Sequence, residues 1–178
     1  MEEAAKAMLI HGTDGLGVAA LMRRAGLTHG GFYAHFASRE DLVSHAVERM
    51  FARSESFIAR RLKGKAPGEG LAEMIEGYLS DRARLSPDFA CPIPSISGEA
   101  RRLPEAARAR LSAGVRHVEA IIAESLRAMG RDQAEDLAQS VFAEMVGAMV
   151  LARTIDDTQG ASATLATARE RIRARLGV

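Results

Sequence analysis

Residues 25–42 read AGLTHGGFYAHFASREDL, which is the most informative part of the sequence. It predicts a tight turn at its start, where Gly26 allows backbone geometry that a side chain would hinder. A short helix follows over residues 28–35. Ser38 and Asp41 then have the S-x-x-D spacing of a capping box, which predicts the start of a longer helix. The stretch therefore predicts a turn, a short helix and a capped long helix in succession.

The sequence on either side of this stretch also predicts helices. Apolar residues recur at intervals of three and four, which is the helical period, and strand signals are nearly absent. Before the stretch we expect a first helix that carries Ala5, Met8 and Leu9 and ends at Gly12, and a second helix over residues 18–25. After it we expect a long helix from Ser38 to about Leu62, a helical stripe over residues 71–79 and a short helix to about Arg102. Three further helices are expected: one over residues 111–129 that Gly130 ends, one that Asp132 caps and that runs to about Ile155, and a last one that follows Gly160 and carries Leu165, Ala168, Ile172 and Leu176. The fold class is therefore all-α, with a boundary near Ser38 between a small head, residues 1–40, and a larger body, residues 41–178.

Net charge does not draw this chain to nucleic acid. The 178 residues carry a formal charge of +1, and residues 1–50 hold five Lys or Arg against six Asp or Glu, which gives −1. Any interaction with DNA must therefore rest on individually placed groups.

Cysteine usage and hydropathy indicate the compartment. The single cysteine, Cys91, excludes an intramolecular disulfide and suits a reducing cytoplasm. The longest apolar run, residues 141–152, contains Glu144 and is shorter than the roughly 20 residues that span a bilayer. We therefore expect a cytoplasmic protein with no membrane partner.

The turn and short helix have the pattern of a helix-turn-helix, whose second helix enters the major groove of DNA. Gly30 and Gly31 are poor helix formers, so their backbone is expected to lie close against another surface. Phe32 and Phe36, four residues apart, fall on the inward face of this helix. The outward face is expected to present Thr28, His29, Tyr33 and His35, whose rings and donors suit phosphates and base edges. Arg39 in the first turn of the next helix opposes the helix dipole, which suggests an external anion near it.

These residues resemble the DNA-binding head of TetR-family transcriptional regulators. The family pattern is an Ile-Ala pair and then A-G-V-s-x-G-x-l-Y-x-H-F-x-s-K-e-x-L, and residues 25–42 agree with it in spacing and residue type at a dozen positions. The resemblance covers about the first 50 residues, and the body matches only in its helical layout. It implies a three-helix head joined through a long helix to a body that binds a ligand and dimerises.

The resemblance also implies roles for individual residues. Thr28, His29 and Gly30 would face the groove, Tyr33 and His35 would meet the backbone, and Arg39 would replace the usual phosphate-binding Lys. The candidate DNA-binding set is Thr28, His29, Gly30, Gly31, Tyr33, His35 and Arg39. Three features depart from the pattern: Glu2 and Glu3 stand where a basic segment is usual, the region of Gly17 and Val18 lacks the usual Thr or Ser cap, and Leu21-Met22 replaces Ile-Ala.

The body offers candidate positions for a ligand and for a second copy of the chain. Residues that could line an adaptable apolar pocket are Met74, Tyr78, Phe89, Cys91, Phe142, Met145 and Met149, although each also suits an ordinary core. A small-residue face that would allow close helix approach comprises Ser140, Ala143, Gly147, Ala148 and Leu151, to which the last helix adds Leu165 and Ile172. In the family the last two helices pair with their copies, and packing within one chain is the alternative.

The sequence thus predicts a homodimeric DNA-binding regulator, a repressor, that binds palindromic double-stranded DNA and is released by a small apolar or amphipathic effector. Two alternatives stay open: a thiol-based sensor that uses Cys91, and a helical adaptor that binds only protein. No Ser-His-Asp set, HExxH, phosphate loop or paired catalytic carboxylates are present, so an enzyme is not expected. We also expect no cofactor and no metal.

Overall fold

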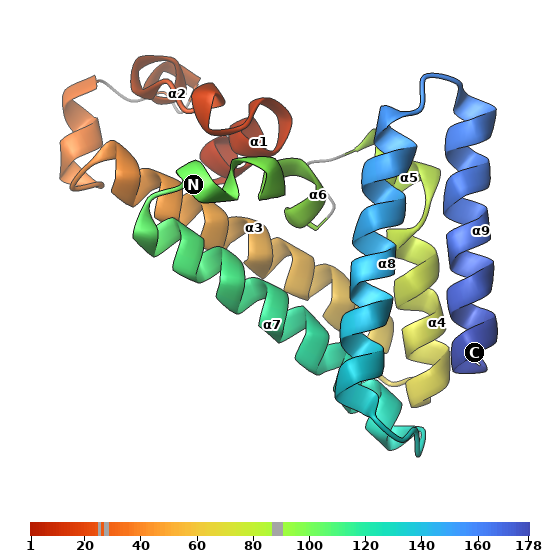
Figure 1. Cartoon of the computed structure of the whole chain (residues 1–178). Helices are drawn as coiled ribbons and strands as arrows, with labels where there is room; N and C mark the ends of the chain where they lie inside the picture. The colour runs from red at the N-terminus through yellow and green to blue at the C-terminus, as the bar shows by residue number, and fades with distance from the viewer. Residues whose placement is uncertain (25, 27–28, 87–90) are drawn as a thin grey trace.

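The computed structural model of the chain describes residues 1–24, 26, 29–86 and 91–178, and the regular structure in these residues is entirely helical. Figure 1 shows a small head around α1 and α2 at one end of the long helix α3. Helices α3 and α7 run side by side through the middle of the molecule, and α4, α8 and α9 stand together at the other end. The predicted all-α fold, with an N-terminal head joined through a long helix to a helical body, is confirmed.

The helices follow the predicted segments closely. Their bounds are α1 Glu2–His11, η1 Thr13–Gly15, α2 Val18–Arg24, η2 His29–Ala34, α3 Arg39–Leu62, α4 Pro67–Tyr78, α5 Asp81–Leu85, α6 Ile93–Ile96, η4 Ser97–Arg102, α7 Glu105–Ala128, α8 Ala134–Thr154 and α9 Thr158–Leu176, where η denotes a 3-10 helix.

The head is held by a few buried apolar side chains. Leu21 and Met22 of α2 are buried, as their spacing predicts, and Leu16 is also fully buried. Helix α1 ends at Gly12, which has a φ of +68° that a residue with a Cβ rarely adopts. This glycine turns the chain from α1 into η1.

The start of α3 is capped by Ser38. Its hydroxyl accepts a hydrogen bond from the backbone N–H of Asp41 at 3.0 Å. The Asp41 carboxylate accepts one from the N–H of Ala37 at 3.1 Å, one residue before the position that a reciprocal capping box would use. The predicted helix start is therefore confirmed, with the return bond shifted by one residue.

Close packing of α3 against α7 joins the head to the body. A Cβ at Gly114 of α7 would meet the ring of Phe51 of α3 at 2.4 Å, so a glycine is needed for this approach. Helix α7 also packs on α8, and α8 on α9. The body core thus lies between α3, α4, α7 and α8.

Four local features differ from the sequence-based expectation. The short helix after the turn is a 3-10 helix, and α5 was not expected because five residues are too few to show a helical period. Asp132 does not cap α8, since Gln133 stands at that position in the left-handed region with φ 53°. Helix α9 starts before Gly160, because the side chain of Asp157 caps it and accepts the Gly160 N–H at 2.6 Å.

A search of the helices in the described residues for a long apolar segment finds none able to cross a membrane.

Candidate nucleic-acid interface and body cavity

The 3-10 helix η2 presents one aromatic side chain outward from a buried aromatic anchor. Phe32 is 1% exposed, and its ring lies 5.1 Å from that of Tyr33 in an edge-on arrangement and 5.4 Å from that of Phe36. Tyr33 is 68% exposed. The buried phenylalanine therefore fixes the backbone of η2 while the adjacent tyrosine points to solvent.

The other predicted DNA-contacting positions lie on or next to η2. His35 is exposed just after it, with its ring 6.4 Å from that of Phe36. Gly31 is half-buried, and His29 and Gly30 belong to the same helix. Thr28 lies outside the described residues.

Arg39, predicted to face an external anion, has a partner within the chain. Its Nη2 donates a hydrogen bond to the backbone carbonyl of Thr13 at 2.6 Å, which ties the start of α3 to η1. The side chain is exposed, and a guanidinium has five N–H donors, so several remain for a phosphate. An external anion is therefore not needed to explain this arginine, although the geometry leaves room for one.

A contact between head and body that the sequence did not indicate involves Glu99 of η4. Its Oε2 accepts hydrogen bonds from the backbone N–H of Thr13, at 3.0 Å, and from the Thr13 hydroxyl. A Cβ on Gly12 would fall 2.0 Å from the Glu99 Oε1. The positive φ thus favours glycine at position 12, and a side chain there would also have to displace the Glu99 carboxylate. No short-range pattern links residues that are 86 positions apart.

Charged groups at the edges of the head were also missed. Glu2 of α1 forms ion pairs with Arg49 and with Arg53 of α3, the latter at 3.4 Å. Arg23 and Arg24 are exposed at the end of α2, next to the turn. Two consecutive arginines just before the turn are a sequence signal that could have placed them in the candidate interface.

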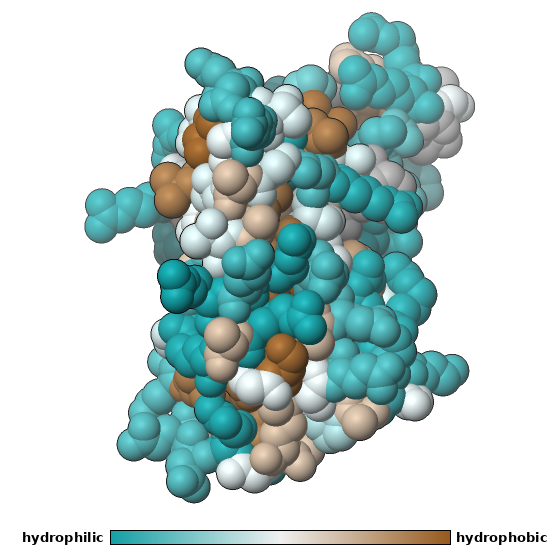
Figure 2. Space-filling view, turned by 90° about the vertical axis from the view of Figure 1, so that its right-hand side faces the viewer, coloured by the Kyte–Doolittle hydropathy of each residue, from teal (hydrophilic) through white to brown (hydrophobic). Residues whose placement is uncertain are grey.

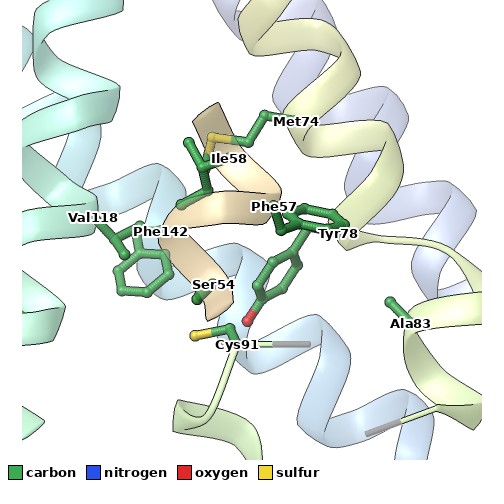
Figure 3. Close-up of a pocket in the computed structure, with 9 residues that line it drawn as sticks. All are labelled: Ser54, Phe57, Ile58, Met74, Tyr78, Ala83, Cys91, Val118 and Phe142. Atoms are coloured by element: carbon green, nitrogen blue, oxygen red, sulfur yellow. The ribbon is translucent and has the colours of Figure 1, made fainter. Parts of the chain in front are cut away.

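The body contains a small cavity between α3, α4, α7 and α8, with a volume of about 10 Å³, which is room for one water-sized group. Figure 3 shows the side chains that surround it. They are Ser54, Phe57, Ile58, Met74, Tyr78, Ala83, Cys91, Val118 and Phe142. Of the predicted pocket residues, Met74, Tyr78, Cys91 and Phe142 therefore line the cavity, Met145 and Met149 are buried in the core outside it, and Phe89 lies outside the described residues.

Polar groups at this cavity are poorly paired. The Tyr78 hydroxyl points toward the Cys91 thiol, and no hydrogen bond of ordinary geometry reaches it from the described residues. Arg153 donates to the Ser95 hydroxyl at 3.0 Å and to the Ala83 carbonyl at 3.2 Å, while its Nε has no partner among those residues. Burial raises the pKa of Tyr78 and lowers that of Arg153.

Burial also controls the chemistry of Cys91. It raises the pKa of the Cys91 thiol to about 11, against weaker opposing effects from the backbone of Ile93, from Tyr78 and from Arg153. The thiol is therefore protonated at neutral pH, whereas the thiolate is the reactive form. This environment weighs against the alternative of a thiol-based sensor.

The predicted dimer residues divide between the surface and the core. Ser140, Ala143 and Leu151 of α8 are exposed, and a Cβ on Gly147 would meet nothing within 4 Å. Ala148, Leu165 and Ile172 are buried within the chain's own core, between α8, α9 and the rest of the body, and are therefore unsuited to contact a second copy. Figure 2, which views the side of the molecule where α9 stands, shows a largely hydrophilic surface with separate hydrophobic areas.

Comparison with protein families gives matches at both ends of the chain. Residues 1–46 match the bacterial regulatory proteins of the tetR family, and residues 67–164, more than half of the chain, match the C-terminal domain of LmrA/YxaF-like transcriptional regulators. The chain belongs to the TetR family of transcriptional regulators. As a member of the TetR family it is a DNA-binding transcriptional regulator with an N-terminal helix-turn-helix and a C-terminal ligand-binding domain.

Solved structures share this TetR fold along most of their length. The structure of E. coli NemR in its reduced form is 20% identical, with 95% of this chain and 94% of that chain covered and a TM-score of 0.80. A TetR-family regulator from Agrobacterium tumefaciens is 23% identical over 95% and 93%, with a TM-score of 0.79. A TetR regulator from Chloroflexus aurantiacus is 24% identical over 98% and 90%, with a TM-score of 0.82. No curated protein matches the chain by sequence.

The described residues of this TetR-family chain hold no group of three or more His, Cys, Asp or Glu that could bind a metal ion.

Proposed function

We propose that this TetR-family regulator is a repressor that binds palindromic operator DNA as a homodimer and is released by a small-molecule ligand. The observation that carries the proposal is the exposed Tyr33 beside the buried Phe32, in the part of the chain that matches the tetR-family head. An exposed aromatic residue with a hydroxyl can donate to a phosphate without adding charge. The proposal needs no catalytic step, and its place of action is the cytoplasm.

In this proposal the head meets DNA through η2 and its flanks. Thr28, His29, Gly30 and Gly31 approach the major groove, where base edges are read. Tyr33, His35 and Arg39 contact the sugar-phosphate backbone, and the exposed Arg23 and Arg24 beside the turn add further phosphate contacts. The head of residues 1–40 acts as the DNA-binding domain, and residues 41–178 act as the body.

A second copy of the chain is needed because one head offers few charged contacts. We place the seam on the exposed face of α8, where Ser140, Ala143 and Gly147 permit close approach and Leu151, which is 59% exposed, supplies apolar area. A two-fold axis there would set two heads on half-sites about one helical turn apart, roughly 34–36 Å. Such a dimer reads a palindrome.

Release by a ligand requires that the ligand prefer one arrangement of the heads. Helix α3 runs from the head into the body, so a shift of α3 moves the head. The hydrogen bonds between Glu99 and Thr13, together with the ion pairs of Glu2 with Arg49 and Arg53, connect the same two parts at the surface. These contacts support a coupling between the body and the orientation of the head.

The proposal is tested by a mobility-shift assay with duplex DNA from the region that flanks the protein's own gene. The sample is first shown to be folded by circular dichroism and dimeric by light scattering. We expect a shifted band that a scrambled duplex of the same length does not give. A folded dimer that shifts none of the flanking duplexes would contradict the proposal, and a binding-competent monomer would contradict the dimeric part of it.

A further inference from the structure

A groove on the outer surface of the body carries an unusual concentration of arginines. It lies between α3, α4 and α5 and has a volume of about 670 Å³, which is in the range of roughly 300–1,000 Å³ typical of small-molecule sites. Arg49, Arg53, Arg60 and Arg61 from α3 and Arg82 from α5 line it, together with the ring of Phe57. Five of its lining residues are therefore cations.

Three of these five arginines form no ion pair in the part of the chain that the structure describes. Arg60 and Arg82 form no ion pair within the described residues, and Arg61 donates only to the carbonyl of Phe57, at 3.1 Å, on its own helix. Burial, followed by the positive charge of Arg60, lowers the pKa of Arg61; the negative charge of Glu73 raises it, and Arg82 makes a smaller lowering contribution. Three neighbouring arginines that form no ion pair favour the binding of an anion.

The acidic groups nearest to the groove are already engaged. Glu76, the one carboxylate among the lining residues, pairs with Arg169 at 3.9 Å and with Arg173 at 3.1 Å, both on α9. Glu73 pairs with Lys65. Neither carboxylate forms an ion pair with an arginine of the groove.

One wall of the groove is apolar. The Arg61 guanidinium lies 3.4 Å above the centre of the Phe57 ring, and Gly77 makes room for it, because a Cβ there would meet the Arg61 Nε at 2.4 Å. Phe57 and Ala83, which Figure 3 labels at the inner cavity, also line the groove, so the groove and the cavity share a wall. A ligand with an anionic head and an apolar part fits this combination of charge and surface.

We infer that this groove binds an amphipathic organic anion, with its carboxylate or phosphate on Arg60, Arg61 and Arg82 and its apolar part against Phe57. Guanidinium groups bind both head groups through paired N–H donors. The inference rests on the proposed function for its regulatory consequence, since it gives the class of the releasing ligand.

The groove also contacts the head, because two of its lining arginines, Arg49 and Arg53, pair with a residue of α1. Arg49 and Arg53 hold Glu2 of α1 by exposed ion pairs, which are weak in water. Glu2 therefore neutralises part of the positive charge at this end of the groove. Removal of the Glu2 charge leaves the charges of Arg49 and Arg53 less compensated, which strengthens the attraction of the groove for an anion.

The test is calorimetric titration of the full chain with decanoate and with decyl phosphate, each at concentrations at which it is monomeric. Decanol and inorganic phosphate serve as the neutral and the purely ionic controls. We expect saturable binding of at least one amphipathic anion, at least tenfold weaker binding of either control, and a loss of affinity of tenfold or more in the Arg60→Gln/Arg82→Gln variant. The Arg108→Gln/Arg171→Gln variant removes two exposed arginines away from the groove and should bind like the wild type.

Three results would overturn the inference: no binding of either amphipathic anion, equal binding by the Arg60→Gln/Arg82→Gln variant, or equal affinity for decanol or inorganic phosphate. Glu2→Gln should tighten ligand binding about twofold through the added positive charge, and weaker binding would contradict an electrostatic role of the groove. Operator binding is measured on the same samples. DNA binding without ligand binding overturns only this inference, whereas ligand binding without DNA binding overturns only the proposed function.

Discussion

The head and the body differ in where they carry positive charge. The head of residues 1–40, which meets a polyanion in the proposed function, holds four basic and four acidic residues and presents Tyr33 and His35. The body, with no proposed contact to DNA, gathers five arginines around one groove. Charge density therefore does not identify the DNA-binding surface here. In the proposed function, the DNA-binding surface is defined by single hydrogen-bond donors on and beside η2. The arginine groove suits a smaller anion.

The largest expected effect comes from removing the anchor of the head face. Phe32→Ala leaves a cavity beneath η2 and should lower the free energy of unfolding by about 3–5 kcal/mol. DNA binding should be lost while decanoate binding by the body persists. Urea denaturation followed by circular dichroism gives the stability. Tyr33→Ala, its exposed neighbour, should change the free energy of unfolding by no more than about 1 kcal/mol, and an equal loss in both variants would mean that Phe32 is not a specific anchor.

A smaller effect is expected where the two regions meet. Glu99→Ala removes the acceptor of the Thr13 N–H and hydroxyl and should cost about 1–2 kcal/mol of stability. It should also reduce the effect of a body ligand on DNA affinity, which anisotropy titrations with and without decanoate measure. The matched control is Glu124→Ala, an exposed position on α7. If Glu99→Ala leaves both stability and ligand response unchanged, this contact does not couple head to body.

The exposed tyrosine should matter for DNA rather than for stability. Tyr33→Ala removes one hydroxyl contact in each head and should weaken duplex binding about tenfold, at about 0.5–1.5 kcal/mol for each hydrogen bond. The loss should be similar for different duplex sequences, whereas His29→Ala should change the preference among them. Fluorescence anisotropy with a set of point-substituted operators separates these outcomes. If the loss of affinity in Tyr33→Ala depends on the duplex sequence, Tyr33 contacts base edges rather than the sugar-phosphate backbone.

The smallest effect concerns which cations meet DNA. Arg39→Gln should lower the slope of log affinity against log salt by about 1 for each head, because one phosphate contact is lost. Arg60→Gln/Arg82→Gln should leave that slope unchanged. Anisotropy titrations at several salt concentrations measure it. If Arg60→Gln/Arg82→Gln lowers the slope and Arg39→Gln does not, the groove arginines contact DNA. The head and the body would then not differ in the way proposed.

The sequence predicted the features that depend on local spacing. The apolar period fixed α3 and α7, Ser38 marked the start of α3, and the inward positions of Leu21, Met22 and Phe32 followed from helical geometry. Even the 3-10 form of η2 keeps Phe32 inward and Tyr33 outward. Local physics was sufficient because each of these features depends on residues a few positions apart.

Features that depend on tertiary packing were not predicted. Glu99 and Thr13 lie 86 positions apart, and the arginine groove forms where α3 packs against α4 and residues of α5 complete the lining. The burial of Ala148 also depends on the helices that pack against α8, so it could not be predicted from the sequence of α8 alone. Such contacts follow from how the helices are arranged, which an apolar period does not specify.

Amide hydrogen exchange of the dimer with and without its operator duplex tests the central claim most directly. The account predicts that DNA slows exchange over residues 29–39 of the head and leaves residues 76–85 beside the groove unchanged. Protection over residues 76–85 with none over residues 29–39 would contradict it.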